Sequence, residues 1–265
     1  MAIEGVLFDF SGTLLRVEST REWLSAVLDE TGTALTDEQL AVTAQQLADV
    51  GALPGGSNPL RVPPHLAELW ATRDQSSALH RAAYTGLARE VTLSDPQLYT
   101  ALYDRHMTPA AWHPYPDTEA VLAGLRERGV KVAVVSNIGW DLRPVFRAHG
   151  LDDLVDACVL SYEHGVQKPD VRLFRAACEA AGCDPGEVLM VGDDRRADGG
   201  AAALGCAVHF VDHLPVGERP AGLTPVLDLV DQGRFGPPFL GDPPRHPERA
   251  ANPQARTPGR GSRIR

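Results

Sequence analysis

The chain has 265 residues, of which 43% are hydrophobic and 23% charged, and its formal net charge is −10. This length and composition suit a globular α/β domain with an insertion. The acidic balance and the absence of a long apolar run exclude nucleic acid and membrane as expected partners. Four cysteines without a CxxC pair, and an N-terminus without a signal-peptide pattern, predict a cytoplasmic protein.

Short apolar runs that end in polar turns recur along the chain and are typical of buried parallel strands. They occupy residues 3–10, 131–135, 156–160, 187–191 and 206–211. Helical patterns lie between them, at residues 117–128, 170–181 and 196–204, and a glycine follows each. Strands and helices that alternate in this way predict a Rossmann-like α/β core, with a parallel sheet covered by helices on both faces.

The stretch after the first strand breaks this alternation. Helical patterns lie at residues 20–30, 37–49, 65–71, 76–90 and 96–106, and no strand is predicted among them. Thr36 and Ser94 are expected N-caps. Residues 16–112 therefore form a predicted α-helical insertion.

The end of the chain differs in composition from the rest. Residues 233–265 hold seven arginines against Asp242 and Glu248, together with many prolines. Apolar periodicity is lost there, which predicts a disordered, basic tail. A segment that docks on an acidic partner is the alternative.

Polar side chains follow the predicted strands. Residues 5–15 read Gly-Val-Leu-Phe-Asp-Phe-Ser-Gly-Thr-Leu-Leu, which delivers Asp9 to a strand end. Ser136 and Asn137 follow the second long strand, and Asp193 and Asp194 follow the fourth. Open α/β sheets bind ligands at the carboxyl ends of their strands. We therefore expect these side chains to meet in one site.

Three of these features resemble the haloacid dehalogenase-like (HAD) superfamily. Residues 9–13, Asp-Phe-Ser-Gly-Thr, resemble its motif I, Asp-x-Asp-x-Thr, and residues 192–198 resemble its motif IV, GDx₄D. The helical insertion resembles the C1 cap of subfamily I. The resemblance covers about residues 3–212. It implies a Rossmann-like core at 1–15 and 113–232, and a cap at 16–112.

The resemblance also implies roles for the side chains that handle the phosphoryl group. Asp9 would be the nucleophile that forms an aspartyl-phosphate. Ser136, followed by Asn137, would hydrogen-bond the transferring phosphoryl group. Lys168 would neutralise charge on the nucleophile and the phosphate. It is one of two lysines in the chain, the other being Lys131.

Acidic side chains crowded beside Asp9 would repel one another unless a cation bridges them, and hard oxygen ligands suit Mg²⁺. Family precedent assigns the metal to Asp9, the backbone carbonyl of Ser11 and Asp193. Asp194 or Asp198 would support the metal or orient Lys168. Capping of a helix N-terminus is the alternative for both Asp194 and Asp198.

Ser11 stands where family phosphatases have the aspartate that protonates the leaving group. The pKa of a serine hydroxyl is too high for it to serve as that general acid and base near neutral pH, and general acid–base catalysis contributes roughly 10²–10⁴-fold. We expect a phosphatase for a small phosphorylated metabolite, with a good leaving group or a proton from water, the substrate or the insertion. His65, His80 and His106 are candidate proton sources there.

Two other activities and a silent binder compete with this interpretation. The dehalogenase branch has an aromatic residue at position 11 and lacks the acidic cluster, although Ser136-Asn137 resembles its Ser-Asn. The phosphonatase branch has alanine at position 11 and needs a cap lysine, and residues 16–112 contain none. A non-catalytic HAD fold that binds Mg²⁺ and phosphate is the third alternative.

Substrate selection is expected from the insertion. Arg73 and Arg81 are candidates for contact with an anionic substrate, and Arg16 is expected near the hinge of the insertion. Trp140 and Asp141 follow the second long strand and are expected at the mouth of the site. The sequence specifies neither the metabolite nor the oligomeric state.

Overall fold

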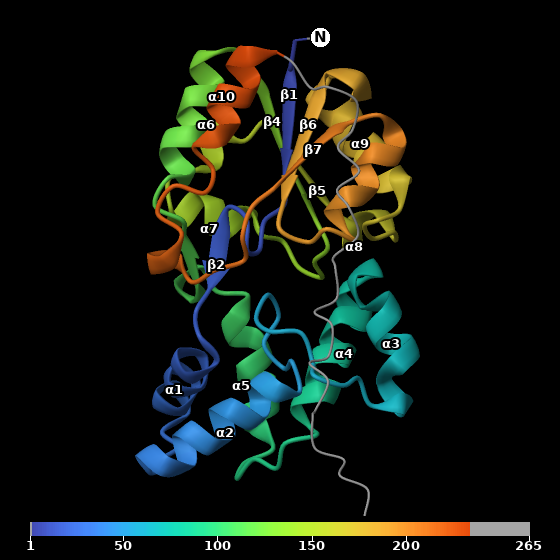
Figure 1. The fold of residues 1–265 in the computed structure, drawn as a ribbon. Coiled ribbons are helices and arrows are strands. Elements are labelled where there is room, and N and C mark those ends of the chain that lie inside the picture. The colour runs from blue at the N-terminus through green and yellow to red at the C-terminus, as the bar shows by residue number, and fades with distance from the viewer. Residues whose placement is uncertain (1, 234–265) are drawn as a thin grey trace, which may run out of the picture. The chain divides into compact units, whose positions relative to one another are not determined.

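The central sheet of the computed structural model has five parallel strands in the order β5-β4-β1-β6-β7 (Figure 1). Its strands are β1 (Gly5–Phe8), β4 (Lys131–Ser136), β5 (Ala157–Leu160), β6 (Val188–Gly192) and β7 (Ala207–Phe210). All five predicted strands are confirmed. The structure describes residues 2–233, so the predicted tail lies outside the described residues except for Gly233.

Side chains alternate between the two faces of β1, as the pleat of a strand requires. Val6 and Phe8 pack into one buried apolar cluster, and Leu7 packs into the other. Both faces are therefore buried, which explains the continuous apolar run in the sequence.

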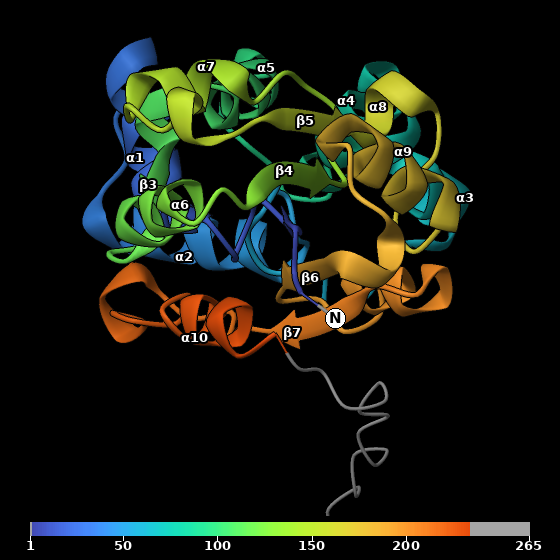
Figure 2. The same ribbon diagram turned by 90° about the horizontal axis from the view of Figure 1, so that it is seen from above.

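Helices cover each face of the sheet (Figure 2). One face carries α6 (Thr118–Glu127), α7 (Arg143–Ala148) and α10 (Pro225–Gln232). The other carries α9 (Val171–Ala181), and the short α8 (Ser161–His164) follows β5. The helices predicted at 117–128 and 170–181 are confirmed, whereas α7, α8 and α10 were not predicted.

The segment predicted as a helix at 196–204 is a 3₁₀ helix at Asp198–Leu204. Its second and third residues are Gly199 and Gly200, and glycine is a poor α-helix former. A Cβ on Gly200 would lie 2.7 Å from the Pro169 carbonyl oxygen, so the backbone passes close to the loop that carries Lys168. The tighter turn brings Asp198 to the sheet end.

Five α-helices fill the stretch between the first and second strands of the sheet. They are α1 (Thr20–Thr31), α2 (Asp37–Asp49), α3 (Ala67–Thr72), α4 (Ser77–Ala88) and α5 (Gln97–His106). Thr36 caps α2, because its hydroxyl accepts from Gln39 N–H at 3.2 Å. The prediction that Ser94 caps α5 is wrong, because the side chain of Asp95 accepts the hydrogen bond from Gln97 N–H at 2.8 Å. No helix within residues 2–233 has the length and apolar character needed to cross a bilayer.

A two-stranded antiparallel ladder marks where the chain leaves and rejoins the sheet. It pairs β2 (Leu15–Val17) with β3 (Trp112–Pro114). The prediction of no strand over 16–112 is wrong at both ends, because three residues are too short to show an alternating pattern. Residues 18–111, between these strands, are called the helical insertion below.

The helical insertion contacts the loops at the strand ends. Ser161 Oγ donates to the Asp74 carbonyl at 2.5 Å, and Gln167 Nε2 donates to the Ala71 carbonyl at 3.0 Å. A Cβ on Gly139 would lie 2.2 Å from the Cβ of His80. The backbone after β4 therefore lies directly against α4, and an alanine at 139 would force the two apart.

Candidate active site

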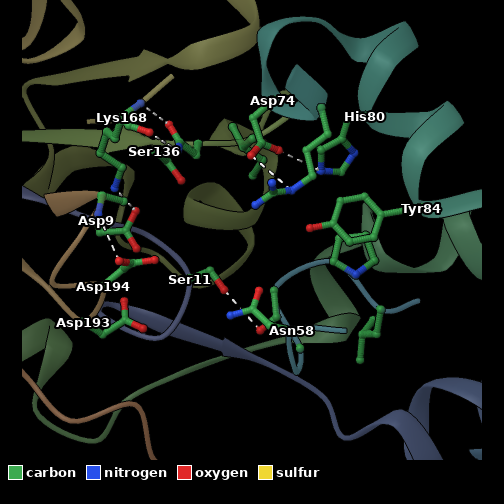
Figure 3. Close-up of a pocket in the computed structure, with 18 of the residues that line it drawn as sticks. Asp9, Ser11, Asn58, Asp74, His80, Tyr84, Ser136, Lys168, Asp193 and Asp194 are labelled. Carbon is green, nitrogen blue, oxygen red and sulfur yellow. Dashed lines mark hydrogen bonds and ion pairs between the residues drawn. The ribbon is translucent and has the colours of Figure 1, made fainter. Parts of the chain in front are cut away.

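A cavity of about 160 Å³ lies where the strand ends face the helical insertion (Figure 3). The residues predicted to follow strands of the sheet line it, namely Asp9, Ser11, Ser136, Asn137, Trp140, Lys168, Asp193 and Asp194. Asp198 lies behind this wall and is fully buried. The structure thus brings together the side chains that the sequence placed at separate strand ends.

Lys168 joins two buried carboxylates at the floor of the cavity. Its Nζ donates to Asp9 Oδ1 and to Asp198 Oδ1, both at 2.6 Å. The backbone N–H of Asp9 donates to the Val191 carbonyl at 2.9 Å, which anchors β1 to β6 at this point. Asp198 therefore orients Lys168, and Lys168 holds the Asp9 carboxylate.

Burial controls the protonation of this group. It raises the pKa of Asp9 to about 8, against the opposing effect of Lys168, and the nearby Asp198 and Asp193 add to the rise. Burial likewise raises the pKa of Asp198. Burial acts to lower the pKa of Lys168, but Asp198 and Asp9 more than offset it and raise that pKa above its usual value. Lys168 therefore stays a cation at neutral pH.

Asp193 has its own partners, and sequence reasoning missed two of them. Thr13 Oγ1 donates to Asp193 Oδ1 at 3.1 Å, and His213 Nδ1 lies 2.5 Å from Asp193 Oδ2. Arg16 contacts the other ring nitrogen of His213. Although burial opposes it, the bond to His213 holds the pKa of Asp193 below its usual value. Thr13 belongs to motif I, whereas His213 has no local sequence signal and arrives through the loop after β7.

The acidic cluster fits a divalent cation. Carboxylate oxygens of Asp9, Asp193 and Asp198 lie within 4.8 Å of one another, and this crowding adds to the raised pKa of Asp9, which a bound cation would oppose. Asp198 is fully buried and does not line the cavity, whereas Asp9 and Asp193 do. Asp9 and Asp193 remain as ligands, and a small set of hard oxygen ligands suits Mg²⁺, which keeps several waters.

Asp194 and Asn137 form hydrogen bonds with backbone groups of nearby loops. Asp194 Oδ1 accepts from the N–H groups of Arg196 at 2.8 Å and Ala197 at 2.9 Å, which favours the capping alternative for this residue. Asn137 Nδ2 donates to the Lys168 carbonyl at 3.0 Å, and its Oδ1 accepts from the Lys168 N–H at 2.6 Å. Asn137 therefore positions the lysine loop, while the buried Ser136 lines the cavity.

Ser11 faces the helical insertion. Its Oγ donates to the Gly55 carbonyl at 3.4 Å. Gly55 has φ +77°, and a Cβ there would lie 2.6 Å from Ser11 Oγ, so the loop at residues 53–58 packs closely over position 11. Figure 3 shows Ser11 beside Asn58 of this loop. The sequence identified the serine but not the loop that covers it.

The three candidate histidines of the insertion lie in different places. His65 is exposed beside Glu90, His106 is fully buried against Tyr103, and His80 lines the cavity. Burial lowers the pKa of His80 well below its usual value, with His106 adding to the effect. His80 is therefore a neutral imidazole at pH 7, which is a poor proton donor.

Buried neutral histidines predict acid sensitivity. Burial lowers the pKa of His106 to about 3, so the folded state takes up fewer protons than the unfolded state once the pH falls below about 6.5. Stability should fall with pH in that range, by up to about 1.4 kcal/mol per pH unit for each such histidine. Urea unfolding of His106→Gln between pH 6.5 and 4.5 should show a shallower slope than the wild type. The exposed His65→Gln should keep the wild-type slope, and an unchanged slope in His106→Gln would contradict the prediction.

A parallel sheet with an acidic pocket at its strand ends, and a helical insertion after the first strand, define the class of this protein. Residues 3–205 match the model of the haloacid dehalogenase-like hydrolases. The chain therefore belongs to the haloacid dehalogenase-like hydrolase family, as its motifs predicted.

Curated relatives include a protein of Bos taurus and an enzyme of Thermus thermophilus. The chain is 36% identical over 138 residues to haloacid dehalogenase-like hydrolase domain-containing protein 3 of Bos taurus, over 51% of this chain and 53% of the relative. It is 34% identical over 166 residues to phosphoserine phosphatase of Thermus thermophilus, over 58% of this chain and 66% of that enzyme. The chain thus spans between half and two thirds of the length of these relatives.

Among solved structures, a dehalogenase superposes with a TM-score of 0.59 at 20% identity, over 86% of this chain and 96% of its own. The HAD phosphatase of Thermococcus onnurineus gives a TM-score of 0.51 at 24% identity, over 79% of this chain and 86% of its own. These likenesses show the fold and leave the choice of reaction to the side chains of the site.

Proposed function

We propose that this chain is a Mg²⁺-dependent phosphatase that hydrolyses a small phosphorylated metabolite through an aspartyl-phosphate at Asp9. The observation that supports it most is the buried Asp9–Lys168–Asp198 group beside Asp193, at the floor of one cavity. Residues 1–15 and 113–232 serve as the catalytic core. The helical insertion, with the flanking residues 16, 17 and 112, serves as the cap.

In this mechanism Asp9 attacks phosphorus, and the bond from phosphorus to the leaving oxygen breaks. Water then attacks phosphorus of the aspartyl-phosphate, which releases phosphate and regenerates the carboxylate. Lys168 and Ser136 offset the charge on the phosphoryl oxygens. Mg²⁺ held by Asp9, Asp193 and the Ser11 carbonyl would supply further charge stabilisation. Asp198 and Asn137 act through Lys168, because both hold it in place.

The retained acids favour phosphoryl chemistry over dehalogenation. A metal-free dehalogenation site has no use for Asp193 beside the nucleophile, yet Thr13 and His213 hold Asp193 there. A dehalogenase shares the fold, but its 20% identity carries no argument about the reaction.

A substrate screen tests this proposal. The purified protein should hydrolyse alkyl, aryl and acyl phosphates with Mg²⁺, and chelation of the metal should remove the activity. Aryl and acyl phosphates should react fastest, because their leaving groups need little protonation and position 11 carries no carboxylate. An absence of turnover on all three classes would favour the non-catalytic alternative, and chloride release from a 2-chloro acid would favour dehalogenation.

A carboxyl group at position 11 should restore the missing acid. In Ser11→Asp we expect kcat for an alkyl phosphate to rise by about 10-fold or more, and kcat for an aryl phosphate to change less, because general acid catalysis matters most for poor leaving groups. Ser11→Asn is the matched control, since asparagine has a volume similar to that of aspartate but no titratable proton. Equal effects of Ser11→Asp on both esters, or the same gain in Ser11→Asn, would contradict this account of Ser11.

A further inference from the structure

The wall of the cavity opposite the nucleophile is polar and comes from the helical insertion. Trp70, Arg73, Asp74, His80 and Tyr84 line it. Figure 3 shows Asp74, His80 and Tyr84 across the cavity from Asp9 and Lys168. None of these five has a role in the phosphoryl transfer described above, so this wall requires another explanation.

Arg73 is held firmly within this wall. Its guanidinium carbon lies 3.8 Å from the centre of the Trp70 ring, and its NH1 donates to the Trp70 carbonyl at 2.8 Å. The Trp70 ring in turn packs edge-on against Tyr84, with ring centres 5.5 Å apart. Asp74 is tied to the core, because its carbonyl accepts from Ser161 Oγ. The guanidinium is therefore placed by packing rather than left free to move.

The charge of Arg73 is only partly matched within the protein. Its Nε lies 3.4 Å from Asp74 Oδ2, but this nitrogen is buried without a hydrogen-bond partner in the described part of the chain. Asp74 also faces His80 Nε2 at 3.8 Å. Burial opposes the charged form of Arg73, but Tyr84 and Asp74 more than offset it and raise the pKa of the guanidinium. Arg73 is thus a cation that contacts Tyr84 and Asp74 and lines the cavity.

The two long cationic side chains that line the cavity differ in what they can bind. Among the described residues that line the cavity, Lys168 is the one lysine and Arg73 is the one arginine. Lys168 already bonds two carboxylates at 2.6 Å. Arg73 keeps a planar fork of donors, which matches the oxygens of a carboxylate or a phosphate. An anion in the cavity would add a partner to the guanidinium that lines it.

We propose that Arg73 forms a second anion-binding subsite, and that the substrate carries an anionic group in addition to its reacting phosphate. This inference rests on the proposed function. The cavity of about 160 Å³ holds a compact molecule, so the second group stands a few atoms from the phosphate. Arg73 is a specificity-determining residue in this scheme, and Trp70, Asp74 and Tyr84 position it.

The test compares esters of matched length in the wild type and in Arg73→Gln. Phosphoglycolate against ethyl phosphate tests a carboxylate, and propanediol bisphosphate against propyl phosphate tests a second phosphate. The wild type should prefer at least one charged ester by 10-fold or more in kcat/KM. In Arg73→Gln this preference should disappear, because KM for the charged ester rises. The fall in kcat/KM for the charged ester should be at least 10-fold larger than any fall for phenyl phosphate. Arg73→Lys should restore part of it.

Arg81→Gln is the matched control. Arg81 lies on the neighbouring turn of the insertion, pairs with the exposed Asp104 at 2.7 Å and does not line the cavity. This variant should keep the wild-type preference. Equal losses of Arg73→Gln on charged and uncharged esters, or a wild type without preference, would overturn the subsite.

Calorimetric binding separates this inference from the proposed function. If no ester of any kind is hydrolysed, the proposed function fails, but the subsite still predicts that the wild type binds a charged ester at least 10-fold more tightly than its uncharged partner. That difference should disappear in Arg73→Gln. Equal binding of the two esters to the wild type would reject the subsite independently of catalysis.

Discussion

Asp9→Asn should abolish turnover, with kcat at least about 10⁴-fold below the wild type, because an amide cannot form the covalent intermediate. The fold should persist, since the Asn oxygen can still accept from Lys168, which lies 2.6 Å from Asp9 Oδ1. Steady-state assays on a fast aryl phosphate measure the loss, and circular dichroism checks the fold. Turnover within 10-fold of the wild type would refute Asp9 as the nucleophile.

The covalent step can be tested directly in the same pair of proteins. Acid quenching of the wild type with a phosphate ester labelled at phosphorus should trap label on the protein, and Asp9→Asn should trap none. Asp104→Asn is the matched control, because Asp104 is exposed and pairs with Arg81. It should leave both turnover and labelling at wild-type levels, and a comparable loss there would point to a general effect of amide substitution.

Lys168→Met should impair both activity and stability. Methionine keeps much of the side-chain volume, but it leaves the buried Asp9 and Asp198 without their shared cation. Removing one partner of a buried ion pair costs about 3–5 kcal/mol, and losing charge stabilisation at the phosphoryl group costs about 10²-fold or more in kcat. Urea unfolding at pH 7 and turnover of an aryl phosphate measure the two effects.

Lys131 provides an unusually close control, since it is the other lysine of the chain. It is exposed and pairs with the exposed Asp156 at 3.0 Å, and such pairs contribute about 0–1 kcal/mol. Lys131→Met should therefore leave turnover unchanged and lower stability little. Similar losses in the two variants would show that Lys168 does not have the role proposed here.

The core of the fold was predictable because its signals are local. The run at β1 alternates faces and ends at Asp9, and each predicted strand of the sheet is present. The ladder of β2 and β3 was missed because its residues are far apart in sequence and each strand has three residues. The helical segment predicted at 196–204 forms a 3₁₀ helix at Asp198–Leu204, and its helix type was not predictable because the contact of Gly200 with Pro169 is tertiary.

The candidate site was likewise predictable from the sequence only in part. Side chains at strand ends could be placed together because parallel strands end at a common edge. His213 reaches Asp193 through the loop after β7, and Gly55 reaches Ser11 from 44 residues away. Neither contact follows from spacing or periodicity. Arg73 was predicted from the sequence as a contact for an anionic substrate, but its stacking on Trp70 is visible only in the folded insertion.

The two walls of the cavity have a consequence for how such a protein changes over evolution. One wall comes from the segments that follow the strands of the sheet, including Lys168 after α8 and His213 after β7, and the other comes from residues 53–84. Under the proposal that Arg73 selects the substrate, a mutation at Arg73 or Tyr84 would alter which molecules bind and leave Asp9 and Lys168 in place. Gene duplication followed by drift in that one segment would produce paralogues with new substrates and the same chemistry.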